Sequence, residues 1–255
     1  MKTLYLQASP EDIADAVIFS GDPGRVRRVC EKLEKVHKIS ENREFVTYTG
    51  SYRGMPVTVT STGIGAPSAA IAMEEMYACG MKTAVRLGTV MGLDGQLGEF
   101  IIPRAAMREE STSSTYVRPS YPAAADFSLV NCMNTAVEAE KGTYSNGIVC
   151  SMDGYYSRMK SCRLAEEMKF DVDATVPELK KYHIVGLDME TSLILTLGAL
   201  MNIRACSVTY VTVLDGLKEM LENEARIQGE YQLIHVVLEG LFADWSKHGA
   251  GSVTK

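Results

Sequence analysis

The sequence has few of the features that mark membrane-bound or secreted proteins. Its 255 residues contain no uninterrupted apolar run near the roughly 18 residues that a membrane-spanning helix requires. The chain reaches Glu11 and Asp12 before any apolar core of signal-peptide length. We therefore expect a cytoplasmic protein that does not bind a membrane.

Metal and redox motifs are also missing. The four histidines form no HxxxH or HExxH pair, and no two cysteines have CxxC spacing. The six cysteines are Cys30, Cys79, Cys132, Cys150, Cys162 and Cys206. Because no signal peptide is evident, we expect reduced thiols. The sequence therefore predicts no metal site.

Charge and motif patterns exclude further classes of protein. The net charge of −6, from 26 basic and 32 acidic residues, argues against nucleic-acid binding. No Walker loop, GxGxxG or GxSxG motif occurs, which disfavours a nucleotide hydrolase, a dinucleotide-dependent oxidoreductase and a serine hydrolase. An anionic substrate would therefore have to meet a local cluster of arginines.

The composition is typical of a globular protein, with 46% apolar and 23% charged residues. Segments of strand and helix character alternate along the chain without a long linker, repeat or low-complexity tract. This alternation predicts an α/β sandwich around a mixed sheet, with residues 1–255 as a single domain.

The expected elements follow from hydrophobic periodicity and turn residues. The predicted strands are 16–20, 83–90, 100–107, 147–153 and 205–215, together with a hairpin over 43–63. The predicted helices are 26–36, 66–79, 122–142, 184–202 and 222–245. The polar, proline-bearing segment 111–122 is expected to be a mobile, lid-like loop.

A glycine-rich turn, GDPGR, follows the first predicted strand at Gly21–Arg25. Glycine there allows close backbone approach, free N–H groups would face outward, and the Arg25 guanidinium can bind an oxyanion. The turn therefore indicates a phosphate site. A plain turn with a solvated arginine is the alternative.

Arg86 lies inside an apolar strand and is followed by Gly88 and Thr89. An unpaired buried charge is costly, so Arg86 needs either a carboxylate or a bound anion. Ligands collect at the carboxyl ends of strands in such sheets, and two strand-end arginines together favour anion binding.

Three carboxylates are candidate functional groups. Glu190 could hydrogen-bond the vicinal hydroxyls of a sugar, or the Asp188–Glu190 pair could simply favour the positive end of a helix. Asp215 ends the most β-rich strand, as a catalytic acid or as a turn residue. Arg226, eleven residues later, could polarise Asp215 or be a surface arginine.

Six segments then stand in the order of a known family. They are GDPGR (21–25), NREF (42–45), STGIGAPSAAIAMEE (61–75), RLGT (86–89), SMDGYY (151–156) and GLDMETS (186–192). From about residue 5 to about residue 242, the chain resembles the nucleoside phosphorylases of the purine/uridine phosphorylase family. The STGIGAPS segment is similar to the uridine branch.

The resemblance implies a fold, a reaction and an assembly. The fold would be a single-domain, three-layer α/β/α sandwich with a mixed, partly barrel-like central sheet. The reaction would be reversible phosphorolysis, in which phosphate attacks a nucleoside to give a free base and a pentose 1-phosphate. No cofactor would be needed, because phosphate is a co-substrate. The protein would be a homodimer with shared active sites, or a hexamer of such dimers.

The resemblance also implies roles for individual residues. Phosphate would be held by Gly21, Arg25, Arg86 and Thr89, with Arg43 contributed across a dimer interface. Ribose would be held by Met189 and Glu190, with Tyr5 reaching the neighbouring subunit's 5′-hydroxyl. The base would contact Tyr155, Asp188 and Met159, and the catalytic pair of the purine branch would be Asp215 and Arg226.

The chain departs from the family pattern where the base would bind. The family usually has a glycine two residues after the threonine, where this chain has Met91 and then Gly92, so either one residue is inserted or Met91 occupies space that the substrate needs. Met159 and Ser161 stand where the uridine branch reads its pyrimidine with a Gln-x-Arg pair, and Gly216 replaces a further arginine.

We therefore expect a nucleoside phosphorylase, with uridine slightly favoured over a 6-oxopurine nucleoside. Pyrimidine readout would require substitution of the lost pair by Arg158 or Arg163. The second hypothesis is a purine nucleoside phosphorylase with Asp215 as general acid, and the third is a non-catalytic nucleoside binder.

Overall fold

A computed structural model describes residues 1–214 and 217–248. The strands are β1 (Ala16–Ser20), β2 (Glu34–Asn42), β3 (Phe45–Tyr52), β4 (Met55–Ser61), β5 (Thr83–Gly92), β6 (Phe100–Ile101), β7 (Ala105–Glu109), β8 (Ala123–Ala124), β9 (Tyr144–Ser145), β10 (Ile148–Met152), β11 (Ile184–Asp188), β12 (Arg204–Leu214) and β13 (Glu219–Met220). The longer helices are α1 (Pro23–Cys30), α2 (Ala66–Ala78), α4 (Phe127–Ala139), α7 (Thr191–Leu200) and α8 (Asn223–His248). Shorter helical segments are η1 (Pro10–Asp12), α3 (Ser113–Tyr116), η2 (Tyr155–Met159), α5 (Arg163–Met168), η3 (Val172–Ala174) and α6 (Thr175–Lys181).

The strands form one mixed sheet with β5 at its centre. The main path runs β2-β3-β4-β1-β5-β11-β10-β7-β8, and β12 pairs with β5 away from this path. The first half of β5 is parallel to both β1 and β12, whereas its last two residues pair antiparallel with β11. This branching around β5 brings the ends of β1, β5, β11 and β12 together.

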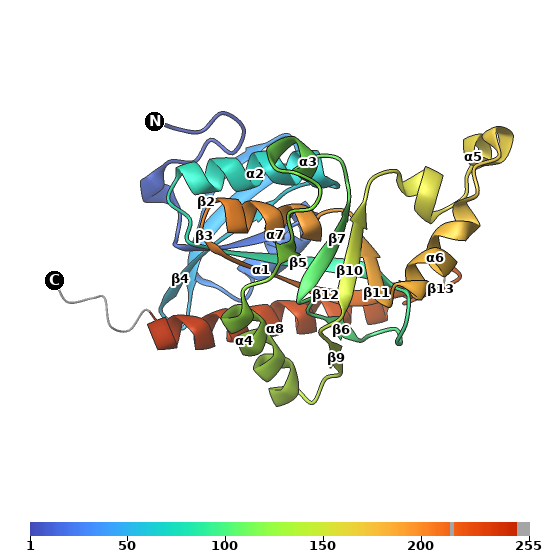
Figure 1. The fold of residues 1–255 in the computed structure, drawn as a ribbon. Coiled ribbons are helices and arrows are strands. Elements are labelled where there is room, and N and C mark those ends of the chain that lie inside the picture. Colours follow the sequence, from blue (N-terminus) through green and yellow to red (C-terminus); the bar gives the residue numbers. More distant parts are fainter. Residues whose placement is uncertain (215–216, 249–255) are drawn as a thin grey trace.

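Helices cover both faces of the sheet (Figure 1). On one face, α2 and α7 pack against β1, β5 and β12. On the other face, α4 and α8 pack against each other and against β12, with α1 beside β3 and β4. The predicted three-layer α/β/α sandwich is therefore confirmed.

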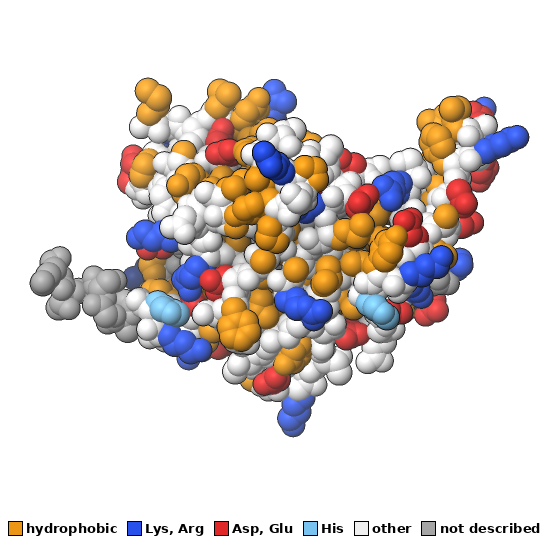
Figure 2. Space-filling model, viewed as in Figure 1, with side chains coloured by type: hydrophobic (Ala, Val, Ile, Leu, Met, Phe, Trp, Pro, Cys, Tyr) orange, Lys and Arg blue, Asp and Glu red, His pale blue; other side chains and the backbone are white. Residues whose placement is uncertain are grey.

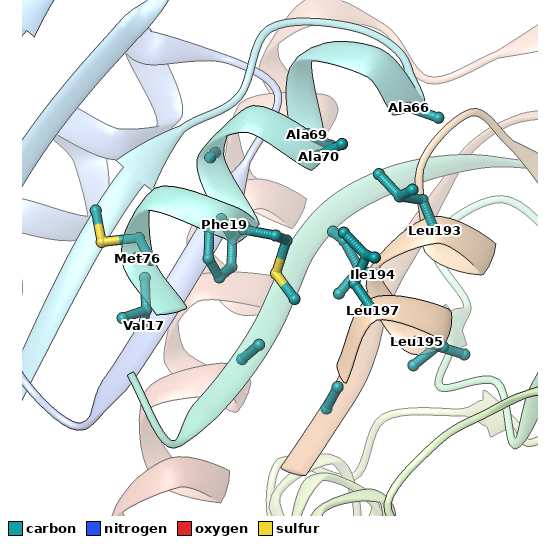
Figure 3. Packing of buried hydrophobic residues seen from close by; sticks show 14 of the residues in the cluster. Val17, Phe19, Ala66, Ala69, Ala70, Met76, Leu193, Ile194, Leu195 and Leu197 are labelled. Atoms are coloured by element: carbon teal, nitrogen blue, oxygen red, sulfur yellow. The ribbon is translucent and has the colours of Figure 1, made fainter. Parts of the chain in front are cut away.

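The two cores follow from strand alternation in β1. Val17 and Phe19 point toward α2 and α7, where Figure 3 shows them near Met76 and Leu197. Ile18 points to the opposite face and belongs to the core under α1, α4 and α8. Successive side chains of a strand face opposite sides, and each large side chain buried this way stabilises the fold by about 1.5–3 kcal/mol.

The predicted helix over 26–36 is wrong in its second half. Helix α1 ends at Cys30, and residues from Glu34 onward form β2, paired antiparallel with β3. A Cβ on Gly50 of β3 would lie 2.9 Å from the Glu34 carbonyl oxygen, so glycine permits this close pairing. The sheet contact overrides a helical spacing that is only local.

The predicted helix over 184–202 is also wrong in its first part. Residues Ile184–Asp188 form strand β11, which pairs parallel with β10, and α7 begins only at Thr191. The Asp188 carboxylate accepts hydrogen bonds from the backbone and hydroxyl of Thr191 and so fixes the start of α7. Both elements are buried, and periodicity cannot separate a buried strand from a buried helix.

Two further expectations need correction or detail. The predicted strand 100–107 is broken at Pro103 into β6, which pairs with β12, and β7, which pairs with β10. Within the predicted lid 111–122, Ser113–Tyr116 form α3. The Arg108 guanidinium donates to four backbone carbonyls of residues 117–121 and to the Ser113 hydroxyl, so this segment is tied to β7. Lid motion stays a prediction.

The segment between η2 and α6 projects from the body of the molecule, with α5 at its tip (Figure 1). Its apolar side chains Leu164, Met168 and Phe170 are exposed, and orange atoms gather on this arm in Figure 2. In the described part of the chain, no helix is both long and apolar enough to cross a membrane.

Candidate active site

A cavity of about 530 Å³ opens where the ends of β1, β5, β11 and β12 meet. Its size lies within the range of small-molecule sites, about 300–1,000 Å³. Nine of the residues predicted from the sequence line it: Gly21, Arg25, Arg86, Thr89, Tyr155, Met159, Asp188, Met189 and Glu190. The structure thus brings together segments up to 169 residues apart in the sequence.

The other predicted site residues lie elsewhere. Arg43 is exposed, and its guanidinium carbon lies 5.6 Å from the centre of the Tyr5 ring. Tyr5 lines a separate depression beside α2 and α3. Arg226 is exposed in the first turn of α8, and Asp215 lies outside the described residues. A single subunit therefore does not bring Tyr5, Arg43 or Arg226 to the cavity.

Arg86 projects from the buried centre of β5 and is 7% exposed. Its Nη2 donates to Glu190 Oε2 at 2.6 Å and lies 3.2 Å from Asp188 Oδ2. Burial alone would lower the pKa of the Arg86 guanidinium, but the Asp188 and Glu190 carboxylates outweigh burial and raise it. Arg86 therefore carries a fixed positive charge at the cavity wall.

One nitrogen of Arg86 is left for a ligand. Among the described residues, nothing accepts a hydrogen bond from Arg86 Nη1, although this atom is buried. An unsatisfied buried donor is costly, and a charged one more so. The two carboxylates hold the guanidinium in place while Nη1 remains able to bind an anion.

Gly88 makes room for this guanidinium. A Cβ at position 88 would lie 1.8 Å from Arg86 Nη1 and 2.6 Å from its central carbon. Any side chain at this position would therefore displace the guanidinium. The glycine two residues after Arg86 is therefore required by this close approach.

Arg25 is the second buried arginine of the cavity. Its Nη2 donates to Glu230 at 3.0 Å and its Nη1 to the Ser20 hydroxyl at 3.3 Å, whereas its Nε has no partner among the described residues. Glu230 is 4% exposed and also pairs with Arg28.

Sequence reasoning missed Glu230. The signal was available, because Glu230 stands four residues before Ile234 on the apolar stripe of the predicted C-terminal helix. A carboxylate on such a face needs a buried partner.

Two of the N–H groups of the GDPGR turn, those of Gly24 and Arg25, already have a partner. The Asp22 carboxylate accepts hydrogen bonds from the backbone of Gly24 at 2.8 Å and of Arg25 at 3.1 Å. Aspartate is a preferred residue at a helix start, and here it uses the donors that the prediction gave to phosphate. Gly21 does permit a close approach, but to the Gly63 carbonyl, which would lie 3.0 Å from a Cβ at position 21.

Asp188 and Glu190 are fixed by several hydrogen bonds. Glu190 Oε1 accepts from the Gly65 backbone at 2.6 Å, beyond its contact with Arg86. Asp188 Oδ1 accepts from the Ser151 hydroxyl at 2.5 Å. Both carboxylates are buried, at 6% and 7% exposure, so their orientation at the cavity wall is set.

The remaining wall of the cavity is apolar. Met91 and Met159 line it and are 6% and 7% exposed. The two arginines that could have replaced the missing pyrimidine readers point elsewhere: Arg158 pairs with Glu109 and Arg163 with Glu167. Neither lines the cavity, so within one subunit neither arginine is placed to replace the missing pair.

The cavity has the size and the polar groups to hold a small ligand that carries an anion and hydroxyl groups. Buried arginines offer unpaired donors, and a fixed carboxylate lies within hydrogen-bond distance of one of them. Within the described residues, no group of three His, Cys, Asp or Glu side chains is placed to hold a metal ion.

The chain belongs to the phosphorylase superfamily, whose family model matches residues 15–233. It is 33% identical over 247 residues to a uridine phosphorylase of Thermococcus kodakarensis, covering 95% of this chain and 87% of that protein. It is also 30% identical over 212 residues to a guanosine phosphorylase of Halorubrum lacusprofundi, covering 82% and 83%.

Solved structures agree with this membership. The crystal structure of a uridine phosphorylase from Vibrio fischeri, in complex with 6-hydroxy-1-naphthoic acid, matches with a TM-score of 0.85 at 32% identity. The match covers 95% of this chain and 97% of that chain. The resemblance predicted from six sequence segments is therefore confirmed.

Proposed function

We propose that the chain is a nucleoside phosphorylase, a pentosyltransferase that moves the pentose of a nucleoside from its base to phosphate, with uridine favoured. One observation carries the proposal most directly. Arg25, from the first turn of α1, and Arg86, from the middle of β5, line one cavity, and each keeps a buried N–H without a partner among the described residues. Each guanidinium is held by a carboxylate, which orients it without using all its donors.

The proposed reaction needs only two substrates. A phosphate oxygen forms a bond to C1′ of the nucleoside while the C1′–N bond breaks, and the electron pair of that bond passes to the base, which takes up a proton. Arg25, Arg86 and Thr89 would hold phosphate, and two guanidinium groups in fixed positions convert a bimolecular attack into a positioned one.

The carboxylates complete the proposed site. Glu190, with Met189 beside it, would hold the ribose hydroxyls, and its bond to Arg86 links the ribose position to the phosphate position. Positive charge develops on the sugar in the transition state of such a reaction, and the phosphate and buried carboxylates would stabilise it. Tyr155 would stack on the sugar or base, beside Met159 and Asp188.

Uridine is favoured because several relatives carry the name uridine phosphorylase, among them proteins at 33%, 32% and 29% identity. A purine nucleoside is the second candidate, since another relative is a guanosine phosphorylase. In that case Asp215 would protonate the purine at N7, assisted by Arg226.

Assembly, cofactor use and location are part of the proposal. We infer a homodimer, or a hexamer of dimers, in which Tyr5 and Arg43 of one subunit complete the site of the next, because a single subunit keeps both away from its own cavity. The reaction calls for no cofactor, and a cytoplasmic location stays a prediction.

The proposal is tested by incubating the protein with uridine or inosine, with and without phosphate, and following base release. Uracil release that requires phosphate supports it. Arg86→Ala should lower kcat/KM by at least about 100-fold, because it removes a charge-assisted donor and leaves two buried carboxylates unpaired. Nucleoside binding without base release would instead support the non-catalytic binder.

A further inference from the structure

One wall of the cavity is apolar and rich in sulfur. Met91, Met159 and Met189 line the cavity, together with Val213 and Leu217. All five belong to or pack against one hydrophobic cluster. Methionine side chains are flexible and polarisable, and they adapt to ligands of different shape.

The carboxylates that line the cavity, Asp22, Asp188 and Glu190, already accept hydrogen bonds, and the unpaired donors of Arg25 and Arg86 are assigned to phosphate. No Asn or Gln side chain lines the cavity in the described part of the chain. Its two arginines are both held by buried carboxylates. Asp188 accepts hydrogen bonds from Ser151 and Thr191 in addition to its ion pair with Arg86.

The edge of uracil is polar and would be recognised best by a wall with hydrogen-bonding groups. It presents an N3–H donor between two carbonyl oxygens, and a buried donor without an acceptor lowers affinity by roughly tenfold or more. A methyl group on N3 removes this donor and adds apolar surface that the methionines can contact. A site that hydrogen-bonds N3–H would instead reject the methylated base by about 10⁴-fold.

We propose, resting on the phosphorylase function above, that this chain recognises its base by apolar contact with Met91 and Met159 and not by hydrogen bonds to the base edge. Its substrates are then pyrimidine nucleosides whose base edge is alkylated or otherwise apolar. The kcat/KM for 3-methyluridine should be comparable to that for uridine or higher. Met91 and Met159, which both depart from the family pattern, are the residues that set this specificity.

The test compares uridine with 3-methyluridine on the wild-type protein in the presence of phosphate. Both release their base through N1, so the leaving atom is the same. A kcat/KM for 3-methyluridine of one third of the uridine value or more supports the proposal. A lower value overturns it, because a hydrogen bond to N3–H must then contribute to recognition.

Two variants at one position sharpen the result. Met159→Gln places an amide on the wall and should shift the preference toward uridine by at least tenfold, whereas Met159→Leu should leave the ratio of the two kcat/KM values unchanged. An unchanged ratio in correctly folded Met159→Gln, judged by its circular dichroism, would overturn the role of Met159.

Failure of the proposed function is distinguishable from failure of this inference. If neither nucleoside releases its base, phosphorolysis of pyrimidine nucleosides is excluded. Calorimetric titration of both nucleosides into the wild-type protein with phosphate then tests how the base is recognised. A Kd for 3-methyluridine no more than three times that of uridine supports apolar recognition. A larger ratio, or no binding of either nucleoside, overturns it.

Discussion

At the scale of single residues, the central feature of the cavity is the way in which Arg86 is held. Sequence reasoning left two alternatives for this buried charge, a carboxylate or an anion. The structure shows that Asp188 and Glu190 pair with Nη2, while Nη1 has no partner among the described residues. The two alternatives are compatible, because a guanidinium has more than one face of donors.

Gly88→Ala should weaken phosphate binding without unfolding the protein. The new Cβ would lie 1.8 Å from Arg86 Nη1 and would push aside the end of a flexible side chain rather than backbone. We expect KM for phosphate to rise at least about tenfold and Tm to fall, because a displaced guanidinium leaves the buried Asp188 and Glu190 carboxylates without their ion pair. Initial rates against phosphate concentration and a thermal melt measure both.

Gly54→Ala is the matched control for backbone effects. Gly54 lies in the β3–β4 turn with φ of 84° and nothing within 4 Å of a Cβ, far from the cavity lining. This variant should lower Tm and leave KM for phosphate unchanged. An unaltered phosphate KM in Gly88→Ala would show that the position of Arg86 does not matter for phosphate.

Asp215→Ala tests the purine alternative. If Asp215 protonates a leaving purine, the variant should slow inosine cleavage far more than it weakens phosphate binding. Equal inosine turnover in variant and wild type would remove Asp215 from the mechanism. Steady-state kinetics with inosine as variable substrate give the answer.

At the scale of elements, the sequence predicted the framework well where local signals agree with the fold. The hairpin over 43–63, the helix over 66–79 and the strand over 83–90 are confirmed within a few residues. Gly80, with φ of 98°, follows the end of α2, where glycine readily adopts a left-handed conformation. These segments carry strong turn or cap residues at their boundaries.

The errors fall where a distant partner decides the structure. Residues Glu34–Asn42 form strand β2 because they pair with β3. Residues Ile184–Asp188 form strand β11 because they pair with β10. Likewise Glu230 and Arg25 are 205 residues apart and meet only in the folded chain. Assignment of the whole chain to one domain and the roles of individual site residues stay predictions.

Arg108→Ala should loosen the segment 113–121. The guanidinium makes five hydrogen bonds to this segment, four of them to backbone carbonyls. We expect amides of residues 114–121 to exchange at least about tenfold faster, equivalent to about 1.4 kcal/mol of local stability. Hydrogen-exchange mass spectrometry measures this.

The control for this prediction is Arg104→Ala, since Arg104 donates to the Asn146 carbonyl, outside this segment. Arg104→Ala should leave exchange of 114–121 as in the wild type. If Arg108→Ala also leaves it unchanged, the arginine does not restrain the segment.

Glu239 on α8 should give the protein a small acid-side pH dependence. Burial alone would raise its pKa, but the Tyr52 hydroxyl and Arg53 donate to it and lower the pKa below its ordinary value of 4.5. Such a depressed pKa stabilises the fold fully above about pH 4.5, and this stability is lost as the pH falls through the folded value.

We therefore expect Glu239→Gln to lose less Tm than the wild type between pH 7 and about pH 3.5. The difference corresponds to less than about 1 kcal/mol, because the carboxylate and Arg53 are partly exposed. Thermal melts at both pH values test this, and parallel losses in the two proteins would show that Glu239 does not contribute.

At the scale of the whole molecule, the site is proposed to be shared between subunits. Arg25→Ala and Arg43→Ala should each be nearly inactive, but co-expression should restore up to about a quarter of the activity, because half of the dimers would be mixed and each would have one intact site. Activity no greater than that of the single variants would place the complete site within one subunit.

The central claim is that this cavity joins a pentose to phosphate. The most direct measurement is phosphorus-31 NMR of the wild-type protein with uridine and inorganic phosphate, with uracil followed in parallel. We predict that the phosphate signal falls as a sugar 1-phosphate signal rises, one for each uracil released. Uracil release without a sugar phosphate, or no release of base from any nucleoside, would contradict the account.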